Sequence, residues 1–561
     1  MKTVIIIFSI IFTTSISYCS PVPGKITNWK IGKENKNIST IIQQVQLSPN
    51  NISSFYYNTG IFDQDKRTAN TPGFEWPKGS GHQACFSAGL SIGTFINGSL
   101  TEASCSYTGE YGPGYINNSS GSPVVVTNSD FKIYKVSAGD NAGNNPDYAN
   151  WYKMIPYGAP YDDVNHNGIY DNGIDIPGIK NAASTLFGCL TDGTPANHIA
   201  SEGFGGGTAP LFCEMHFTAW AYNNAGMEDV QFVKWVIINK NVMQWNNTFM
   251  AIVSDPDLGY GNDDFIGCDT IQKLGYCYNG DNDDSGNLYG YGANPPAFGI
   301  DFLKTAVNRP VNPNAEIGMT AFDYFTNSSP VICERDPNPD VQGAYNYLKG
   351  YKLDGTPWVN AQSGQITKKC YPGAPEVNIG WTERTGSVQN CGGGLTGTII
   401  PSNPSGDRRF IMSSGADNFT MPQNDSQTVI IAQLVARGTN NWNSVTKLKQ
   451  LDAAVKVFYS TNVSVNNISS EIPSSFSLYQ NYPNPFNPTT NIKFDMVRNG
   501  IVNLKVNDVS GKEVATLINN EMVTAGTNIV SFDANNFASG IYFYTLTAGT
   551  FSETKRMVLV K

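Results

Sequence analysis

Apolar residues in this chain occur in short or alternating runs that end at Gly, Pro, Asn or Asp. Strands of about four to eight residues between tight turns produce this pattern, whereas a helix needs a longer run with apolar residues three and four positions apart. Residues 229–239, 248–253 and 428–436 are apolar on both faces, as in strands inside a β-sandwich. The sequence therefore predicts an all-β protein.

One segment has a helical pattern instead. Between residues 445 and 459, Leu448, Leu451, Val455 and Phe458 recur at three- and four-residue steps and form one apolar face. We expect an amphipathic helix here.

Length and charge limit the class of protein. The chain has 561 residues, which suggests about two to four domains. Charged residues make up 15% and aromatic residues 12%, a balance typical of extracellular β-rich proteins. The formal net charge is −10 and is spread without long runs of one sign, which excludes a nucleic-acid-binding surface.

Residues 1–19 have the pattern of a secretory signal peptide. Lys2 supplies the positive charge and residues 4–12 form the apolar stretch. Small residues allow cleavage after Ser17 or after Cys19, and the bulky Tyr18 disfavours lipidation of Cys19. No later stretch approaches the roughly 18 apolar residues of a spanning helix. We therefore expect a secreted or outer-surface protein whose mature chain has no transmembrane helix.

Ten cysteines fit an oxidising compartment. If Cys19 is removed with the signal peptide, nine remain, so at least one is unpaired or bonds another chain. No CxxC pair occurs, which argues against zinc ribbons and thiol redox sites. Close spacing favours three disulfides without fixing the connectivity: Cys85–Cys105, Cys189–Cys213 and Cys268–Cys277.

The end of the chain is expected to be a separate domain. Residues 461–475 are rich in Ser and Asn and are predicted to form a linker. Beyond it, residues 476–561 alternate clearly between apolar and polar positions, as in "VNLKVND", and contain about seven short strands. This pattern predicts a small β-sandwich of Ig-like proportions. The stretch "NYPNPFNPTT" lies near its start, and proline removes backbone donors, so residues 483–488 are predicted to form an extended edge segment that resists pairing.

Three ordered motifs in residues 476–561 carry a family resemblance. They are "PNPFNP", "GKEVATL", and "GIYFYTL" followed by "KRMVLVK" at the end of the chain. Together they resemble the type A C-terminal sorting domain of the type IX secretion system. The resemblance implies export through the inner membrane and passage across the outer membrane, with the type IX machinery as partner of this domain. It also implies removal of the domain as the cargo is attached or released.

Residues 20–460 would then be the cargo, a β-sandwich-rich region of one or two subdomains. Stretches such as "NTGIFDQDKRTANTPGFEWPKGSG" and "GDRRFIMSSG" resemble large surface proteins of Bacteroidetes- and Ignavibacteria-type bacteria that carry the same sorting domain. That group has no assigned activity, so the resemblance implies a type of protein without implying its chemistry.

The sharpest local motif in the cargo is "DDVNHNGIYDNGID", residues 162–175. Side-chain oxygens recur at alternate positions, as in the first half of a calcium-binding loop, and Gly168 allows the sharp turn. Ile174 stands where an EF-hand has Glu and no helical pattern flanks the loop, so it is not an EF-hand. The alternative is an Asx-rich turn that holds no ion. The predicted calcium ligands are Asp163, Asn165, Asn167, Ile169, Asp171 and Asp175.

Two further acidic clusters stand out in this low-charge chain. The first is a predicted second calcium site, because dense carboxylates need a counter-ion or water. The other, at residues 281–284, is predicted to be a solvated turn. The ligands predicted for the second calcium site are Asp255, Asp257, Asp263, Asp264 and Asp269.

The sequence contains few motifs that would indicate an enzyme. Residues 201–210, "SEGFGGGTAP", lack the Lys-Ser/Thr ending of a phosphate loop and are expected to be a surface loop or tight turn. Glu214 and His216 would share one face of a strand and form a hydrogen-bonded pair rather than a ligand pair.

Paired acids perform glycoside hydrolysis, and the candidate acids are Asp255, Asp257, Glu202 and Glu214. Aromatic residues that could stack on sugars are Tyr56, Tyr57, Trp151, Tyr152 and Trp358.

The sequence therefore predicts a protein exported by the type IX secretion system whose cargo is a calcium-stabilised adhesion or surface-structural module. The alternative is a carbohydrate-binding protein or glycoside hydrolase, with a glycan or another cell-surface ligand. Whether the cargo is an enzyme stays open, with the balance against it.

Overall fold

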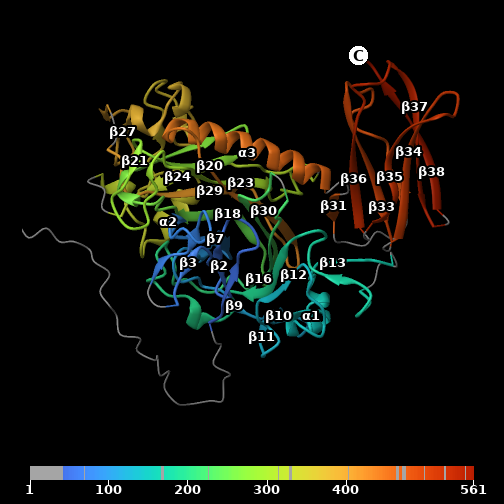
Figure 1. Cartoon of the computed structure of the whole chain (residues 1–561), viewed down its shortest axis with the longest axis horizontal. Coiled ribbons are helices and arrows are strands. Elements are labelled where there is room, and N and C mark those ends of the chain that lie inside the picture. Colours follow the sequence, from blue (N-terminus) through green and yellow to red (C-terminus); the bar gives the residue numbers. More distant parts are fainter. Residues whose placement is uncertain are drawn as a thin grey trace, which may run out of the picture.

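The computed structural model describes residues 42–561 apart from 68–69, 166–169, 225, 314, 328–330, 402–403, 463–465, 470–475, 498–499, 524–525 and 550. The predicted signal peptide and Cys19 lie outside the described residues. Strands are the main element, which confirms the all-β prediction (Figure 1). No helix within the described ranges is long and apolar enough to cross a membrane.

Two large antiparallel sheets form the cargo region. The first is nine-stranded and contains, in spatial order, β12 (Tyr134–Ser137), β15 (Ser184–Thr191), β16 (Cys213–Ala221), β17 (Val230–Asn239), β30 (Ser426–Ala436), β23 (Ala297–Lys304), β20 (Leu274–Asn279) and β19 (Asp264–Asp269), with β9 (Gly112–Pro113) beside β15. The second is five-stranded, in the order β24 (Ala321–Phe325), β29 (Arg409–Gly415), β18 (Trp245–Asp255), β7 (Ser87–Ile96) and β8 (Ser99–Ala103).

Short two-stranded ribbons connect and flank these sheets. They are β1 (Gln44–Leu47) with β2 (Ser54–Tyr57), β3 (Gln64–Asp65) with β4 (Thr71–Pro72), β5 (Phe74–Glu75) with β6 (Gln83–Cys85), β10 (Tyr115–Asn117) with β11 (Val124–Val126), β13 (Tyr161–Asp162) with β14 (Ile176–Pro177), β21 (Asp283–Asp284) with β22 (Gly292–Ala293), β25 (Trp358–Val359) with β26 (Ile366–Thr367), and β27 (Ser387–Gln389) with β28 (Thr398–Ile400).

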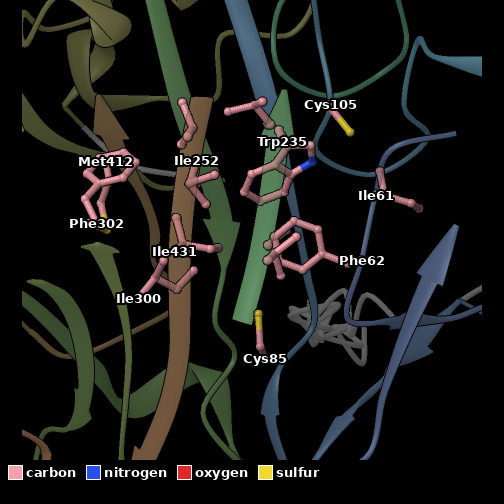
Figure 2. Packing of buried hydrophobic residues seen from close by; sticks show 14 of the residues in the cluster. Ile61, Phe62, Cys85, Cys105, Trp235, Ile252, Ile300, Phe302, Met412 and Ile431 are labelled. Atoms are coloured by element: carbon pink, nitrogen blue, oxygen red, sulfur yellow. The ribbon is translucent and has the colours of Figure 1, made fainter. Parts of the chain in front are cut away.

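The inner faces of the two large sheets share one hydrophobic core. Trp235 and Ile431 from the nine-stranded sheet belong to the same buried cluster as Ile252 and Met412 from the five-stranded sheet (Figure 2). Burial of side chains this large is the main stabilising contribution to such a sandwich. The cargo is therefore a β-sandwich, as predicted.

Helices cover the outer faces, which explains why the central strands are apolar on both sides. Helix α3 (Asn441–Asn462) packs Val445 and Leu448 against Phe232 and Leu434 of the nine-stranded sheet. Helix α2 (Val341–Leu348) covers the five-stranded sheet in the same way, and α1 (Pro146–Ala149) is a single turn. The predicted helix at 445–459 and the predicted strands at 229–239, 248–253 and 428–436 are confirmed.

The C-terminal domain is a smaller sandwich with its own core. One sheet has the order β31 (Asn466–Ser469), β36 (Gly526–Asp533), β33 (Thr489–Met496) and β32 (Ser477–Leu478). The other has the order β35 (Glu513–Val523), β34 (Gly500–Asp508), β37 (Gly540–Ala548) and β38 (Phe551–Leu559). Val502, Leu504 and Val506 point into the core between the sheets, as their alternation predicts.

Two features of the predicted linker, residues 461–475, differ from expectation. Helix α3 extends to Asn462, and β31 pairs with β36 of the C-terminal domain. The first strand of that domain therefore precedes residue 476. Composition did not reveal this strand, because its Asn and Ser residues give no apolar alternation. Its pairing with β36 is visible only in the folded domain.

The proline-rich segment lies against the free edge of β38 rather than avoiding contact. Phe486 is 2% exposed, its N–H donates to the Val558 carbonyl at 2.9 Å, and its carbonyl accepts from Val560 N at 3.0 Å. The side chain of Asn484 accepts from Val558 N at 2.9 Å. Because the prolines offer no donors, this segment covers part of an edge strand without presenting a full new edge.

The three disulfides favoured by spacing are wrong. Cys333 and Cys391 form the one disulfide of the described residues, and the six cysteines of the expected pairs are free and buried. Cys189 and Cys213 show why, since they pack into different clusters on opposite faces of the nine-stranded sheet. Closeness in sequence does not bring two strand residues to the same face.

Candidate functional site

The predicted calcium loop is closed at its base by a two-stranded ribbon, in which β13 pairs with β14. Asp175 is 1% exposed, and its two carboxylate oxygens accept the N–H groups of Val164 at 2.9 Å and Asp171 at 2.7 Å. Asn165 Nδ2 donates to Asp171 Oδ2 at 2.8 Å. The fold thus brings three of the predicted ligands together.

The surroundings of Tyr161 place Asp163 in the same group. Burial raises the pKa of Tyr161, and the charges of Asp163, Asp175 and Asp171 raise it further. All three carboxylates therefore lie near this phenol. The other predicted ligands, Asn167 and Ile169, lie outside the described residues.

Only part of the second predicted calcium cluster comes together. Asp255, the last residue of β18, and Asp257 meet Asp407, and one carboxylate oxygen from each lies within 4.8 Å of the others. Sequence reasoning missed Asp407, although the adjacent run of opposite charges "DRR" in a low-charge chain was a signal.

The remaining members of that cluster have other positions and partners. Asp264 starts β19 and accepts the Leu258 N–H at 2.9 Å, whereas Asp269 ends the same strand and accepts the N–H groups of Ile271 and Gln272. Asp263 ends a 3₁₀ turn, Gly261–Asp263. In the third cluster, Asp281 and Asp283 are exposed as expected, but Asp284 is buried and accepts the N–H groups of Tyr260 and Tyr291.

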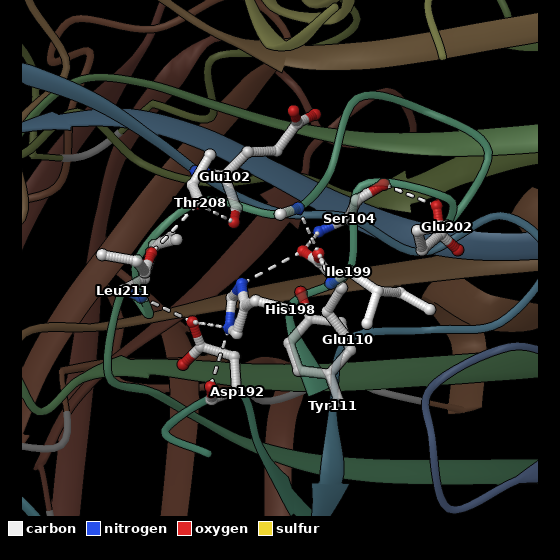
Figure 3. Close-up of polar contacts among 12 residues, drawn as sticks. Glu102, Ser104, Glu110, Tyr111, Asp192, His198, Ile199, Glu202, Thr208 and Leu211 are labelled. Carbon is white, nitrogen blue, oxygen red and sulfur yellow. Dashed lines mark hydrogen bonds and ion pairs between the residues drawn. The ribbon is translucent and has the colours of Figure 1, made fainter. Parts of the chain in front are cut away.

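Glu202 is a structural anchor rather than a free acid, and Figure 3 shows its hydrogen bond with the Ser104 hydroxyl. Its Oε1 accepts four consecutive backbone N–H groups, from Ser106 to Gly109, at 2.6–3.2 Å. Its Oε2 accepts the Phe204 N–H at 3.2 Å and the hydroxyls of Ser104 and Ser106. One carboxylate therefore shapes the whole turn after β8.

The Gly-rich loop is buried over residues 202–206, whereas Ser201, Gly207 and Ala209 are exposed. Gly205 has φ +66°, and a Cβ atom there would lie 2.3 Å from Glu102 Oε2. Burial raises the pKa of Glu102 well above its usual range, and the nearby charges of Glu110 and Glu202 raise it further. Glycines thus allow the loop to pack closely over a buried acid whose ionised form is disfavoured by burial.

His198 lies between two buried acids in the same region (Figure 3). Its Nδ1 is 3.2 Å from Glu110 Oε2, and its Nε2 is 2.8 Å from the Asp192 carbonyl and 3.5 Å from Asp192 Oδ2. Burial lowers the pKa of His198, but the hydrogen bonds and charges of Asp192 and Glu110 outweigh it and raise the pKa to about 10. His198 is therefore a structural cation at neutral pH.

We expect the imidazole of His198 to stay protonated from pH 6 to pH 9 in the folded protein. A raised pKa in the folded state means that the stabilisation is fully present below the unfolded pKa of about 6.5 and is lost as pH rises through about 10. Ring ¹H–¹³C spectra over this pH range test it, with the signal assigned by His198→Gln. A midpoint near 6.5 for that signal would contradict the charge-paired arrangement.

Of the four candidate catalytic acids, Glu202 and Glu214 bind other groups through both carboxylate oxygens, and Asp255 does so through one. Glu214 Oε2 accepts the Ile116 N–H at 2.8 Å, and Oε1 is 2.9 Å from His216 Nε2, as expected for a hydrogen-bonded pair. Burial raises the pKa of Glu214, but the hydrogen bond and charge of His216 lower it overall. Asp255 is ion-paired with Arg409 at 3.1 Å. These partners suit structural roles better than proton transfer.

The aromatic residues proposed to stack on sugars mostly belong to the core. Tyr152 is 47% exposed, whereas Tyr56, Tyr57, Trp151 and Trp358 are at most 3% exposed. A polar cleft of about 410 Å³ lies elsewhere, and its lining includes Asn262, Tyr324, Glu334, Gln389, Asp407 and Arg408.

Comparison with known proteins identifies the end of the chain. Residues 480–561 match the family described as the secretion system C-terminal sorting domain. This match confirms the resemblance carried by the "PNPFNP", "GKEVATL" and C-terminal motifs. Among curated proteins, none matches the chain.

Proposed function

We propose that this protein, which carries a sorting domain for the type IX secretion system at residues 480–561, delivers a calcium-stabilised adhesion or surface-structural module to the outside of the cell. Export by this system and a secreted or outer-surface location follow from the sorting domain. The nature of the cargo rests on the arrangement of its own residues.

A structural role for the cargo is supported by what its buried acids do. Glu202 and Glu214 hold backbone N–H groups and a histidine in place, and Asp192 and Glu110 hold His198. Paired and hydrogen-bonded charges of this kind fix loop geometry, whereas catalytic acids need an oxygen free to face a substrate. The cargo region therefore has the character of a rigid surface module.

The observation that carries the calcium proposal is the gathering of Asp163, Asn165, Asp171 and Asp175 at one loop. Oxygen donors grouped on a loop of this kind suit Ca²⁺, which accepts six to eight oxygen ligands at about 2.3–2.6 Å. The ribbon of β13 and β14 holds the two ends of the loop together, so the ion would act as a staple for an otherwise Gly- and Asn-rich segment.

Calcium should raise the melting temperature of the cargo, and Asp163→Ala should reduce that rise. An ion that binds only the folded state adds about 1.4 kcal/mol at a tenfold excess over Kd. Thermal unfolding followed with and without EDTA measures the effect. The matched control is Asp162→Ala, the neighbouring acid, which pairs with Lys180 at 3.0 Å. Equal responses of the two variants to calcium would refute the role of the loop.

A further inference from the structure

Three aspartates from two neighbouring strands of the five-stranded sheet converge at one end of it. Asp255 is the last residue of β18, Asp257 lies two residues beyond it, and Asp407 lies two residues before β29. The register pairs Ser254 with Phe410, so these ends are adjacent in space. One oxygen from each aspartate lies within 4.8 Å of the others.

The aspartate at the centre of this cluster has an oxygen without a partner. Asp255 is 4% exposed, and its Oδ2 accepts the Tyr107 hydroxyl at 2.8 Å and lies 3.1 Å from an Arg409 nitrogen. Within the described ranges, its buried Oδ1 has no hydrogen-bond partner. A buried carboxylate oxygen left in this state is costly unless a cation or water reaches it.

Arg409 neutralises only part of the charge. It pairs with Asp255 Oδ2 and Asp407 Oδ1, and its Nε donates to the Tyr107 hydroxyl at 2.8 Å. With all three aspartates ionised, the single guanidinium would leave two negative charges unbalanced. One divalent cation would balance this remaining charge.

We propose that Asp255, Asp257 and Asp407 bind a calcium ion that bridges β18 and β29. Ligand oxygens about 2.4 Å from one ion lie at most about 4.8 Å apart, and the three aspartate oxygens meet that limit. The ion uses the side of the cluster that Arg409 leaves free, and water completes its coordination. This site is separate from the loop at residues 162–175.

The surroundings of the cluster give a cation access. Asp407 also lines the polar cleft of about 410 Å³, which gives ions a path from solvent. Tyr107, which orients Asp255, belongs to the turn that Glu202 anchors.

Calorimetric titration of the EDTA-stripped protein with Ca²⁺ tests the site. We expect two bound ions in the parent, and one in Asp257→Asn, with affinity at the lost site reduced at least tenfold. Asp257 is the variant of choice because Arg409 keeps both of its carboxylate partners. Asp269→Asn is the matched control, since it belongs to the same acidic stretch of sequence but ends β19, and it should still bind two ions.

The outcomes separate this site from the loop. If Asp257→Asn binds as many ions as the parent, the site at Asp255, Asp257 and Asp407 does not exist. If Asp163→Ala binds as many as the parent while Asp257→Asn loses one, the loop proposal fails and this one stands. Should Asp257→Asn not fold, anomalous scattering from Tb³⁺-soaked crystals of the parent decides, and no peak between the three aspartates would overturn the assignment.

Discussion

Deletion of residues 476–561 should leave the protein in the periplasm. The deletion removes all but one strand of a sandwich whose core is independent of the cargo, and that sandwich is the type IX sorting domain. Because β31 also belongs to it, a deletion that starts at residue 466 should have the same effect. Fractionation of cells that possess the type IX system, with immunodetection of the cargo, measures the outcome as a near-complete loss of surface or secreted protein.

The control for this deletion must alter the cargo without touching the sorting domain. Glu228→Gln serves, because the side chain of Glu228 accepts only the Gly226 N–H within the described residues, at the surface. This variant should reach the cell exterior in the same amount as the parent. Surface delivery of the truncated chain at the parental level would overturn the assignment of the domain as the export signal.

Glu202→Ala should be the most destabilising single substitution among the acids of the cargo. The substitution removes the acceptor of five backbone N–H groups, all of which donate hydrogen bonds to Glu202 in a buried region. Each buried N–H left without a partner costs about 1–3 kcal/mol, so we expect a total loss of at least about 3 kcal/mol. Glu202→Gln should cost less, about 1–3 kcal/mol, because its one carbonyl oxygen can replace Oε1 while the serine hydroxyls rotate to accept from the amide nitrogen.

Tryptophan fluorescence during urea unfolding measures this effect in the full chain. All nine tryptophans precede residue 476, so the signal comes from outside the sorting domain. Glu228→Gln is again the control, and a change below about 0.5 kcal/mol is expected for it. Should Glu202→Ala unfold within about 1 kcal/mol of the parent, Glu202 is not the anchor of the turn.

Much of the cargo fold follows from local pattern. The strands β17, β18 and β30 were predicted because they are apolar on both faces, and the sandwich explains that property through cores on each side. The helix at residues 441–462 was predicted over residues 445–459 from its periodicity, although its function of covering the nine-stranded sheet was not. The hydrophobic pattern of a segment indicates which of its faces is buried, but not which other element covers that face.

Residue pairing across the chain was not predictable in the same way. Spacing favoured Cys85–Cys105, but the disulfide joins Cys333 and Cys391, which are 58 residues apart. In the structure, Asp255 and Asp257 lie beside Asp407, which is about 150 residues later in the sequence. Asp269, which was predicted to join them, lies at the end of β19 instead. Both cases depend on sheet order, which brings together segments that no local signal connects.

The sequence by itself determined where this protein goes, because the sorting domain is read from contiguous motifs in residues 476–561, and each motif keeps its order and alternation in one short stretch of chain. Only the tertiary structure decided which acids face one another. In the folded chain, Glu202 holds a turn and His198 lies between Glu110 and Asp192. Three aspartates also converge beside Arg409. The physical reason is that hydrogen bonds and charges act over a few ångströms in space, and the pairing of strands, rather than distance along the chain, sets those few ångströms.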